Sequence, residues 1–231
     1  MREYIEFFLF SCVDRLARRL SFRWAGRIGA WLGGAVFSVV GYRKEVTLDN
    51  LSKAFPEKAE EELQNIARRA YRNYGIALVE SMWASGQSAD ALKKVVHATN
   101  PEIVHNARKA GKGVLFLSAH FGSWEFLSTS VPLVLGLPFG MIAQRQRNKH
   151  IDALFEANRS RFGNFIIGMG TSTRKVIKAL ADNHVVLLLG DQSGPKEAVF
   201  VEFFGRPSAT HRGAAAFSLK TGAPIVMGVL L

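Results

Sequence analysis

Two residues at the end of one apolar stretch could carry out acid–base chemistry together, His120 and Glu125. Residues 114–117 are wholly apolar and follow a Gly-Lys-Gly turn, which predicts a buried strand, whereas a helix is expected from Trp124 onward. On one continuous helix the two side chains would point about 140° apart. At a strand–turn–helix junction the glutamate can turn back, hold one imidazole nitrogen and leave the other to accept a proton.

The pattern alone leaves more than one role open for His120. A histidine after a strand most often serves as an ordinary loop or core residue. A zinc site is a weaker alternative, because no third ligand lies at a recognisable spacing and the one cysteine is Cys12. If the histidine is a base, the turn of Phe121, Gly122 and Ser123 is expected to offer backbone N–H groups to developing negative charge. Ser123 is then also expected to cap the following helix.

A second apolar run, residues 185–189, ends in Asp191 and Gln192. Open α/β sheets place their ligands at such strand ends, so both side chains are candidates for the same site. The stretch 145–178 is basic, with eight Lys or Arg residues against two acidic ones. Such a run most often forms a solvated face. Arg145 nevertheless suits a phosphate, because a guanidinium is always charged and binds two oxygens at once.

The segment His-Phe-Gly-Ser-Trp-Glu resembles the H-x4-D/E motif of the lysophospholipid acyltransferase superfamily. Its form is similar to that of the bacterial lipid A biosynthesis (lauroyl/myristoyl) acyltransferase family. Further segments resemble the same family in the same order, from about Gly26 to the last residue. They are the entry segment 43–57, the basic block with Arg145 and Asn148, the Asp191-Gln192 pair, the run 199–205 and the Ala209-Thr210 block. Lys149 and Glu202 stand where the family often has proline.

The resemblance implies a reaction and a set of roles. His120 would be the general base and Glu125 its partner, so a hydroxyl could attack a thioester without a Ser or Cys nucleophile. Arg145 would hold phosphate, and the remaining expected substrate contacts are Asn148, Asp191, Gln192 and Thr210, the last of which could instead cap a helix. The donor would be acyl carrier protein or coenzyme A, and the acceptor an anionic glycolipid such as a lipid A precursor. No metal or other cofactor is implied.

Two alternatives remain beside this prediction. The acceptor could be another lipid, such as a lysophospholipid, a phosphatidylinositol mannoside or an ornithine-type lipid. The protein could also be a non-catalytic binder of membranes or nucleic acid, since its formal net charge is +11. Nucleic acid is disfavoured, because the basic residues lie beside apolar segments and no RRM or KH signature is present.

The N-terminal 41 residues predict a membrane anchor. Residues 1–23 predict an amphipathic helix whose stripe lies within an arc of about 80° and consists of Ile5, Leu9, Cys12, Leu16 and Leu20. The segment 24–41 is more apolar, with one charge at Arg27, and lies at the short limit for crossing a bilayer. Basic residues flank it on both sides, so the positive-inside rule gives no orientation. The segment could span the bilayer, lie in its interface or be a buried core helix. By resemblance, we expect the bacterial inner membrane, with the active site on the cytoplasmic side.

The remainder of the 231 residues is long enough for one core. Residues 59–83 predict an amphipathic helix with a core-packing stripe. From residue 112 short apolar strands alternate with helices, which predicts an α/β domain over 42–231, with a central mixed sheet flanked by helices. Helices are expected near 123–130, 150–161, 172–182 and 209–221, and strands near 114–118, 164–168, 184–189, 198–204 and 224–231. Family members usually continue further, so a missing C-terminal part is also expected.

Overall fold

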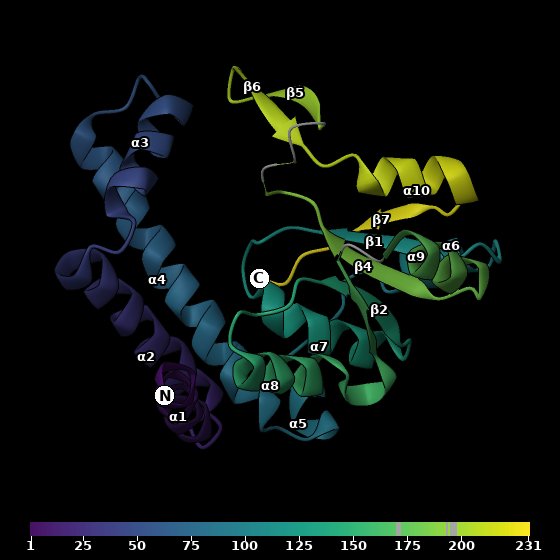
Figure 1. Ribbon diagram of the computed structural model, residues 1–231, viewed down its shortest axis with the longest axis horizontal. Helices are drawn as coiled ribbons and strands as arrows, with labels where there is room; N and C mark the ends of the chain where they lie inside the picture. The colour runs from purple at the N-terminus through teal and green to yellow at the C-terminus, as the bar shows by residue number, and fades with distance from the viewer. Residues whose placement is uncertain (170–171, 193, 195–197) are drawn as a thin grey trace.

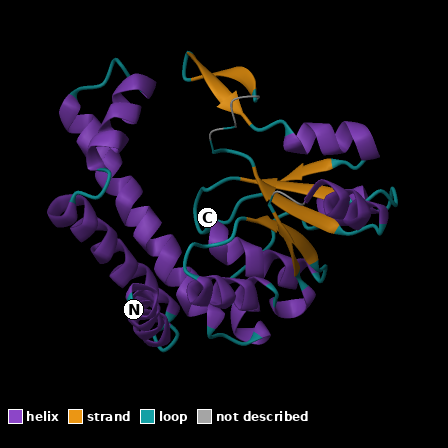
Figure 2. Ribbon diagram, viewed as in Figure 1, coloured by secondary structure: helices purple, strands orange, loops and turns teal. Residues whose placement is uncertain are grey.

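The computed structural model describes residues 1–169, 172–192, 194 and 198–231. Within this part of the chain, five strands form a parallel sheet in the order β3-β2-β4-β1-β7 (Figures 1 and 2). Their bounds are β1 Val114–Ser118, β2 Phe139–Ala143, β3 Phe165–Gly168, β4 Val185–Leu189 and β7 Ile225–Met227. The α/β class is confirmed, but the expected mixed sheet is wrong. The antiparallel pair is a separate hairpin, β5 Val199–Phe203 with β6 Arg206–Thr210.

Helices cover both faces of the sheet, as the apolar residues 114–117 of β1 and the wholly apolar strand β4 require. On one face, helices α6 (Glu102–Arg108) and α7 (Trp124–Leu135) pack against alternate strand residues such as Phe116 and Leu187. On the other face, α9 (Ser172–Ala181) and α10 (Gly213–Thr221) pack against their neighbours Leu115 and Val186. The alternation follows from successive strand side chains pointing to opposite faces.

A layer of helices precedes the sheet, formed by α1 (Arg2–Ala17), α2 (Phe22–Ala35), the π-helical turn η1 (Val36–Val40), α3 (Lys44–Ala54), α4 (Glu60–Ser85) and α5 (Ala89–Lys93). The long helix α4 lies between α2 and the sheet domain (Figure 1). Helices α2 and α4 approach so closely that a Cβ atom added at Gly33 would lie 2.1 Å from the Tyr71 carbonyl oxygen. Glycine at this position is therefore a packing requirement, because any side chain would meet backbone.

The N-terminal helices differ from the expected membrane anchor in their bounds and in their helical geometry. In the described residues no helix is both long and apolar enough to cross a membrane. The predicted apolar helix over 24–41 begins at Phe22 and changes to π-helical geometry at Val36. The stripe predicted on α1 is largely exposed, with Ile5 54%, Leu9 59% and Leu16 66% exposed. The opposite side of α1 is buried at Asp14 and Ala17, where it meets α4.

Further differences concern elements after the first long helices. Strand β2, strand β6 and the short helices α5 and α6 were not predicted, and the last helix begins at Gly213 rather than near residue 209. Helix α8 (Lys149–Arg159) and the short 3-10 turn η2 (Arg161–Gly163) fill the predicted helix near 150–161. Strand β2 escaped the sequence pattern because its five residues, Phe-Gly-Met-Ile-Ala, contain a glycine and follow a proline.

Candidate active site

His120 and Asp191 lie at the carboxyl ends of two neighbouring parallel strands. The register pairs Ser118 of β1 with Leu189 of β4, so the residues two positions further along each strand also meet. The Oδ1 atom of Asp191 lies 2.9 Å from Nδ1 of His120, and its Oδ2 atom accepts the His120 backbone N–H at 2.8 Å. The same carboxylate therefore fixes both the ring and the backbone of the histidine.

The other imidazole nitrogen lies beside Gln192. His120 Nε2 lies 3.4 Å from the side-chain amide nitrogen of Gln192, and the histidine side chain is 34% exposed. With Nδ1–H donating to Asp191, Nε2 carries a lone pair, and the Gln192 amide N–H is the donor that lies nearest to it. This arrangement has the geometry of a general base with an orienting carboxylate.

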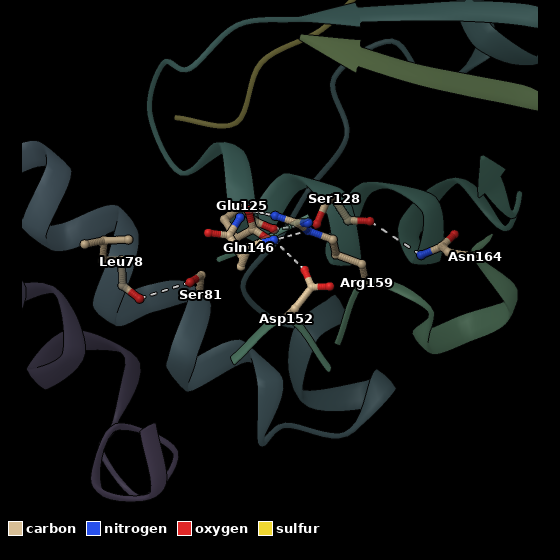
Figure 3. A network of polar contacts seen from close by, with 8 residues as sticks. All are labelled: Leu78, Ser81, Glu125, Ser128, Gln146, Asp152, Arg159 and Asn164. Carbon is tan, nitrogen blue, oxygen red and sulfur yellow. Dashed lines mark hydrogen bonds and ion pairs between the residues drawn. The ribbon is translucent and has the colours of Figure 1, made fainter. Parts of the chain in front are cut away.

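Glu125 does not hold the imidazole as the sequence pattern predicted. Its two carboxylate oxygens accept hydrogen bonds from Arg159, one from Nε at 2.7 Å and one from Nη2 at 2.8 Å (Figure 3). Glu125 lies in the first turn of α7 and Arg159 in the last turn of α8, and each helix end favours the charge that it carries. Among the described residues no hydrogen bond joins Glu125 to His120. The expected contact is therefore wrong, while the catalytic importance of both residues stays a prediction.

The Glu125–Arg159 pair is buried, with side-chain exposures of 11% and 16%. Burial lowers the pKa of Arg159, but the hydrogen bond with Glu125 and the charges of Glu125 and Asp152 outweigh it and raise the pKa. Asp152 also accepts the backbone N–H of Gln146 at 2.7 Å, which ties the loop after β2 to α8 (Figure 3). The network therefore joins α7, α8 and the loop that contains Arg145.

The turn of Phe121, Gly122 and Ser123 connects β1 to α7. Gly122 has a φ of +58°, and an added Cβ would lie 2.0 Å from the Leu230 carbonyl oxygen, so glycine is needed here. The Ser123 N–H donates to that carbonyl at 3.1 Å and is not available to an oxyanion in this arrangement. The Ser123 hydroxyl donates to Glu80 and makes no cap hydrogen bond to α7. Neither group of Ser123 therefore has its expected partner. The N–H expected to serve the oxyanion donates to Leu230, and the hydroxyl expected to cap α7 donates to Glu80.

The five residues predicted to bind substrate lie in four places. Asp191 and Gln192 meet His120, while Arg145 is exposed in the loop after β2. Asn148 is buried at the start of α8, where Oδ1 accepts the N–H groups of residues 150 and 151 and Nδ2 donates to the Glu3 carbonyl. It therefore caps α8 and holds α1. Thr210 ends β6, and its hydroxyl donates to the Ser208 carbonyl, so it does not cap α10.

A sequence profile of the bacterial lipid A biosynthesis acyltransferases matches residues 1–229. The chain belongs to this family. Among curated relatives, lipid A biosynthesis acyltransferase 2 of Shigella flexneri is 26% identical over 189 residues, covering 80% of this chain and 57% of the relative. The Haemophilus influenzae lipid A biosynthesis acyltransferase is 23% identical, with 84% and 60% covered. The Escherichia coli K12 lipid A biosynthesis palmitoleoyltransferase is 25% identical, with 86% and 65% covered. The chain thus spans less than two thirds of each relative's length.

Sequence reasoning missed three contacts of this family member's site. Asp191 was predicted at a strand end but not as the partner of His120. The contacts of Arg159 with Glu125 and of Glu80 with Ser123 were not predicted. The available signal was the pair of apolar runs, since adjacent parallel strands bring their carboxyl ends together. Among the described residues no cluster of three or more His, Cys, Asp or Glu side chains could hold a metal ion.

Proposed function

We propose that this protein moves a fatty acyl group from the thioester of acyl carrier protein, or of coenzyme A, to a hydroxyl of an anionic glycolipid such as a lipid A precursor. The observation that carries the proposal is the His120–Asp191 pair, with Nδ1 of the histidine 2.9 Å from the carboxylate and the histidine side chain partly exposed. Membership of the lipid A acyltransferase family supports the reaction type, as do the printed names of the relatives.

His120 is the general base of the proposed reaction. Its Nε2 takes the proton of the acceptor hydroxyl as the oxygen attacks the thioester carbonyl carbon. The tetrahedral intermediate collapses, the C–S bond breaks, and the leaving thiolate takes the proton from the imidazolium. Asp191 stabilises that imidazolium and keeps Nε2 in the accepting tautomer. A positioned base contributes roughly 10²–10⁴ in rate. No resident cofactor takes part, because the acyl thioester is itself a substrate.

Backbone donors at the start of α7 would stabilise the oxyanion. Ser123 N–H donates to the Leu230 carbonyl, so the proposed donors are the N–H groups of Phe121 and Gly122. The N–H groups of the first turn of α7 supplement them, because the Ser123 side chain accepts none of these. Glu125 contributes indirectly, since its two hydrogen bonds to Arg159 hold that first turn against α8.

The acceptor's phosphate would meet basic side chains on the loop after β2 and on neighbouring helices. Arg145 is exposed there, and the loop is anchored through Gln146 and Asp152. A guanidinium at the end of an anchored loop suits bidentate recognition of phosphate oxygens. The net charge of +11 also favours approach to an anionic lipid surface.

The membrane contact in this proposal is the outer surface of α1 and α2. Phe8 of α1 is 66% exposed and Trp31 of α2 is 69% exposed, although both belong to helices packed on the protein by their other side. Basic residues, including the exposed Arg15 of α1, lie on the same two helices. Apolar side chains with flanking cations are typical of a helix that lies in the interface of an anionic bilayer. We assign this surface to the cytoplasmic side of the bacterial inner membrane, where acyl carrier protein and coenzyme A are found.

The test is acyl transfer by the full-length protein in mixed micelles. Acyl carrier protein and coenzyme A thioesters are each offered with a lipid A precursor, a lysophospholipid, a phosphatidylinositol mannoside and an ornithine lipid, and products are identified by mass spectrometry. We expect acylated lipid A precursor, lost in His120→Ala and retained in His105→Ala, since His105 is exposed on α6. Transfer to a different lipid alone would overturn the acceptor, and absence of any transfer would overturn the function.

A further inference from the structure

Glu80 is a half-buried carboxylate in α4 that the proposed reaction does not use. It accepts a hydrogen bond from the hydroxyl of Ser123, the N-cap residue of α7, and Ser123 is only 7% exposed. Burial raises the pKa of Glu80, although the hydrogen bond from Ser123 lowers it. Partial burial of an acidic side chain costs free energy, because desolvation disfavours its charged form. The contacts of Glu80 are therefore candidates for a functional role.

The contact ties the catalytic turn to a helix more than forty residues earlier in the chain, since Ser123 and Glu80 are 43 positions apart. A second contact from α4 falls on the next residue: the rings of Tyr74 and Trp124 lie 5.4 Å apart. Trp124 in turn lies 5.6 Å from the His120 ring. Asp191, at the end of β4, therefore contacts His120 itself, whereas α4 contacts Ser123 and Trp124, which follow His120 in the chain.

The hydrogen bond also changes how α7 begins. Ser21 and Ser88 are serines at the N-cap positions of α2 and α5, and each accepts a backbone N–H of its own helix. Ser123 occupies the same position on α7 but makes no such bond, because its hydroxyl is directed to Glu80. The N–H groups in the first turn of α7 therefore donate no hydrogen bond to the side chain of the N-cap residue.

We propose that Glu80 is a positioning residue for acyl transfer, acting through Ser123. It fixes the turn between His120 and α7 and keeps the Ser123 hydroxyl away from the α7 amides. The inference rests on the proposed function. The proposed reaction gives Glu80 no contact with substrate or with the reacting atoms. Its loss is therefore expected to lower kcat while leaving KM for donor and acceptor unchanged.

The experiment compares Glu80→Ala, Glu80→Gln and Ser123→Ala with Glu61→Ala, an exposed carboxylate of the same helix. Misplacing a catalytic group by about 1 Å can cost up to roughly 100-fold in rate. We expect Glu80→Ala to lower kcat about 10- to 100-fold with KM within twofold, and Glu80→Gln to remain within about threefold of wild type, because its amide oxygen accepts the same hydrogen bond. Glu80→Ala combined with Ser123→Ala should be no slower than the slower single variant.

A readout independent of activity separates this inference from the proposed function. Hydrogen exchange of the peptide 119–128 should be faster in Glu80→Ala than in wild type and unchanged in Glu61→Ala and Glu80→Gln. Unchanged exchange in Glu80→Ala, or a kcat within twofold of wild type, would overturn the positioning role even if acyl transfer is established. Glu80→Gln as slow as Glu80→Ala would overturn it as well. Absence of transfer in the wild type together with faster exchange would instead overturn the function and leave the link between Glu80 and the turn intact.

Discussion

Replacing Arg159 with methionine should destabilise the protein severely, because the partner that it leaves behind is a buried carboxylate. Glu125 is 9% exposed, and its two oxygens lie 2.7 and 2.8 Å from Arg159 nitrogens. Removing one member of a buried pair typically costs about 3–5 kcal/mol. In a chain of this length 1 kcal/mol shifts Tm by roughly 2–4 °C, so Arg159→Met should lower Tm by roughly 6–20 °C.

The matched control is the exposed pair of Lys178 and Asp182, which has a comparable distance of 2.8 Å but side-chain exposures of 77% and 47%. Lys178→Met should change the free energy of unfolding by no more than about 1 kcal/mol, since solvent screens exposed pairs. The double variant Arg159→Met/Glu125→Met should recover most of the stability lost in Arg159→Met, because no uncompensated charge is left in the interior.

The assay is urea unfolding followed by circular dichroism, in low salt and in 1 M salt (roughly 3 Å screening length). The cost of Arg159→Met should change little with salt. A loss below about 1 kcal/mol, or a double variant whose loss equals the sum of both singles, would refute the assignment of Glu125 as a member of a buried ion pair. The result also decides how activity losses in Glu125 variants are interpreted, since unfolding would produce them without any catalytic role.

Three further predictions concern packing, titration and the lipid surface. Gly33→Ala should lower Tm, because the added Cβ would lie 2.1 Å from a backbone oxygen of α4. Gly34→Ala should leave Tm unchanged, because its added Cβ would meet only the Arg72 side chain, at 3.8 Å. Equal Tm values for the two variants would contradict the close packing of α2 on α4. Burial raises the pKa of Glu80, so its stabilising contribution is present below the unfolded-state pKa and is lost as pH rises through the folded-state pKa. The Tm of Glu80→Gln should therefore exceed the Tm of the wild type by a margin that grows from pH 4 to pH 8. A margin that stays constant with pH would contradict the raised pKa. Phe8→Ser/Leu9→Ser should sediment less with phosphatidylglycerol vesicles than Leu219→Ser, an exposed apolar residue on α10, and equal sedimentation would exclude α1 as the lipid contact.

The fold was largely predictable because its signals are local. The apolar runs at 114–117 and 185–189 lie in β1 and β4, and the long amphipathic pattern lies in α4. The mixed sheet was wrong because strand direction and order are set by tertiary packing, and the runs at 199–203 and 206–210 pair with each other outside the main sheet. Residues 193 and 195–197, within the predicted Asp-Gln segment and its sequel, lie outside the described residues.

The site was predictable as a set of residues but not as a set of contacts. His120 and Asp191 were both placed at strand ends, yet their meeting depends on β1 and β4 being neighbours, which no local pattern reveals. The short spacing of His120 and Glu125 favoured a pair, but the first turn of α7 directs Glu125 to Arg159, a residue 34 positions away. Likewise, Asn148 has the chemistry of a substrate ligand and is used to cap α8.

The central claim, that Asp191 and His120 act as one unit, is tested most directly by a double-mutant cycle in single-turnover acyl transfer on the full-length protein. Asp191→Ala alone should slow transfer by roughly 10² or more. On the His120→Ala background the same change should have almost no further effect, since residues acting as a unit are strongly non-additive. Losses that multiply, or an Asp191→Ala variant within threefold of wild type, would contradict this claim.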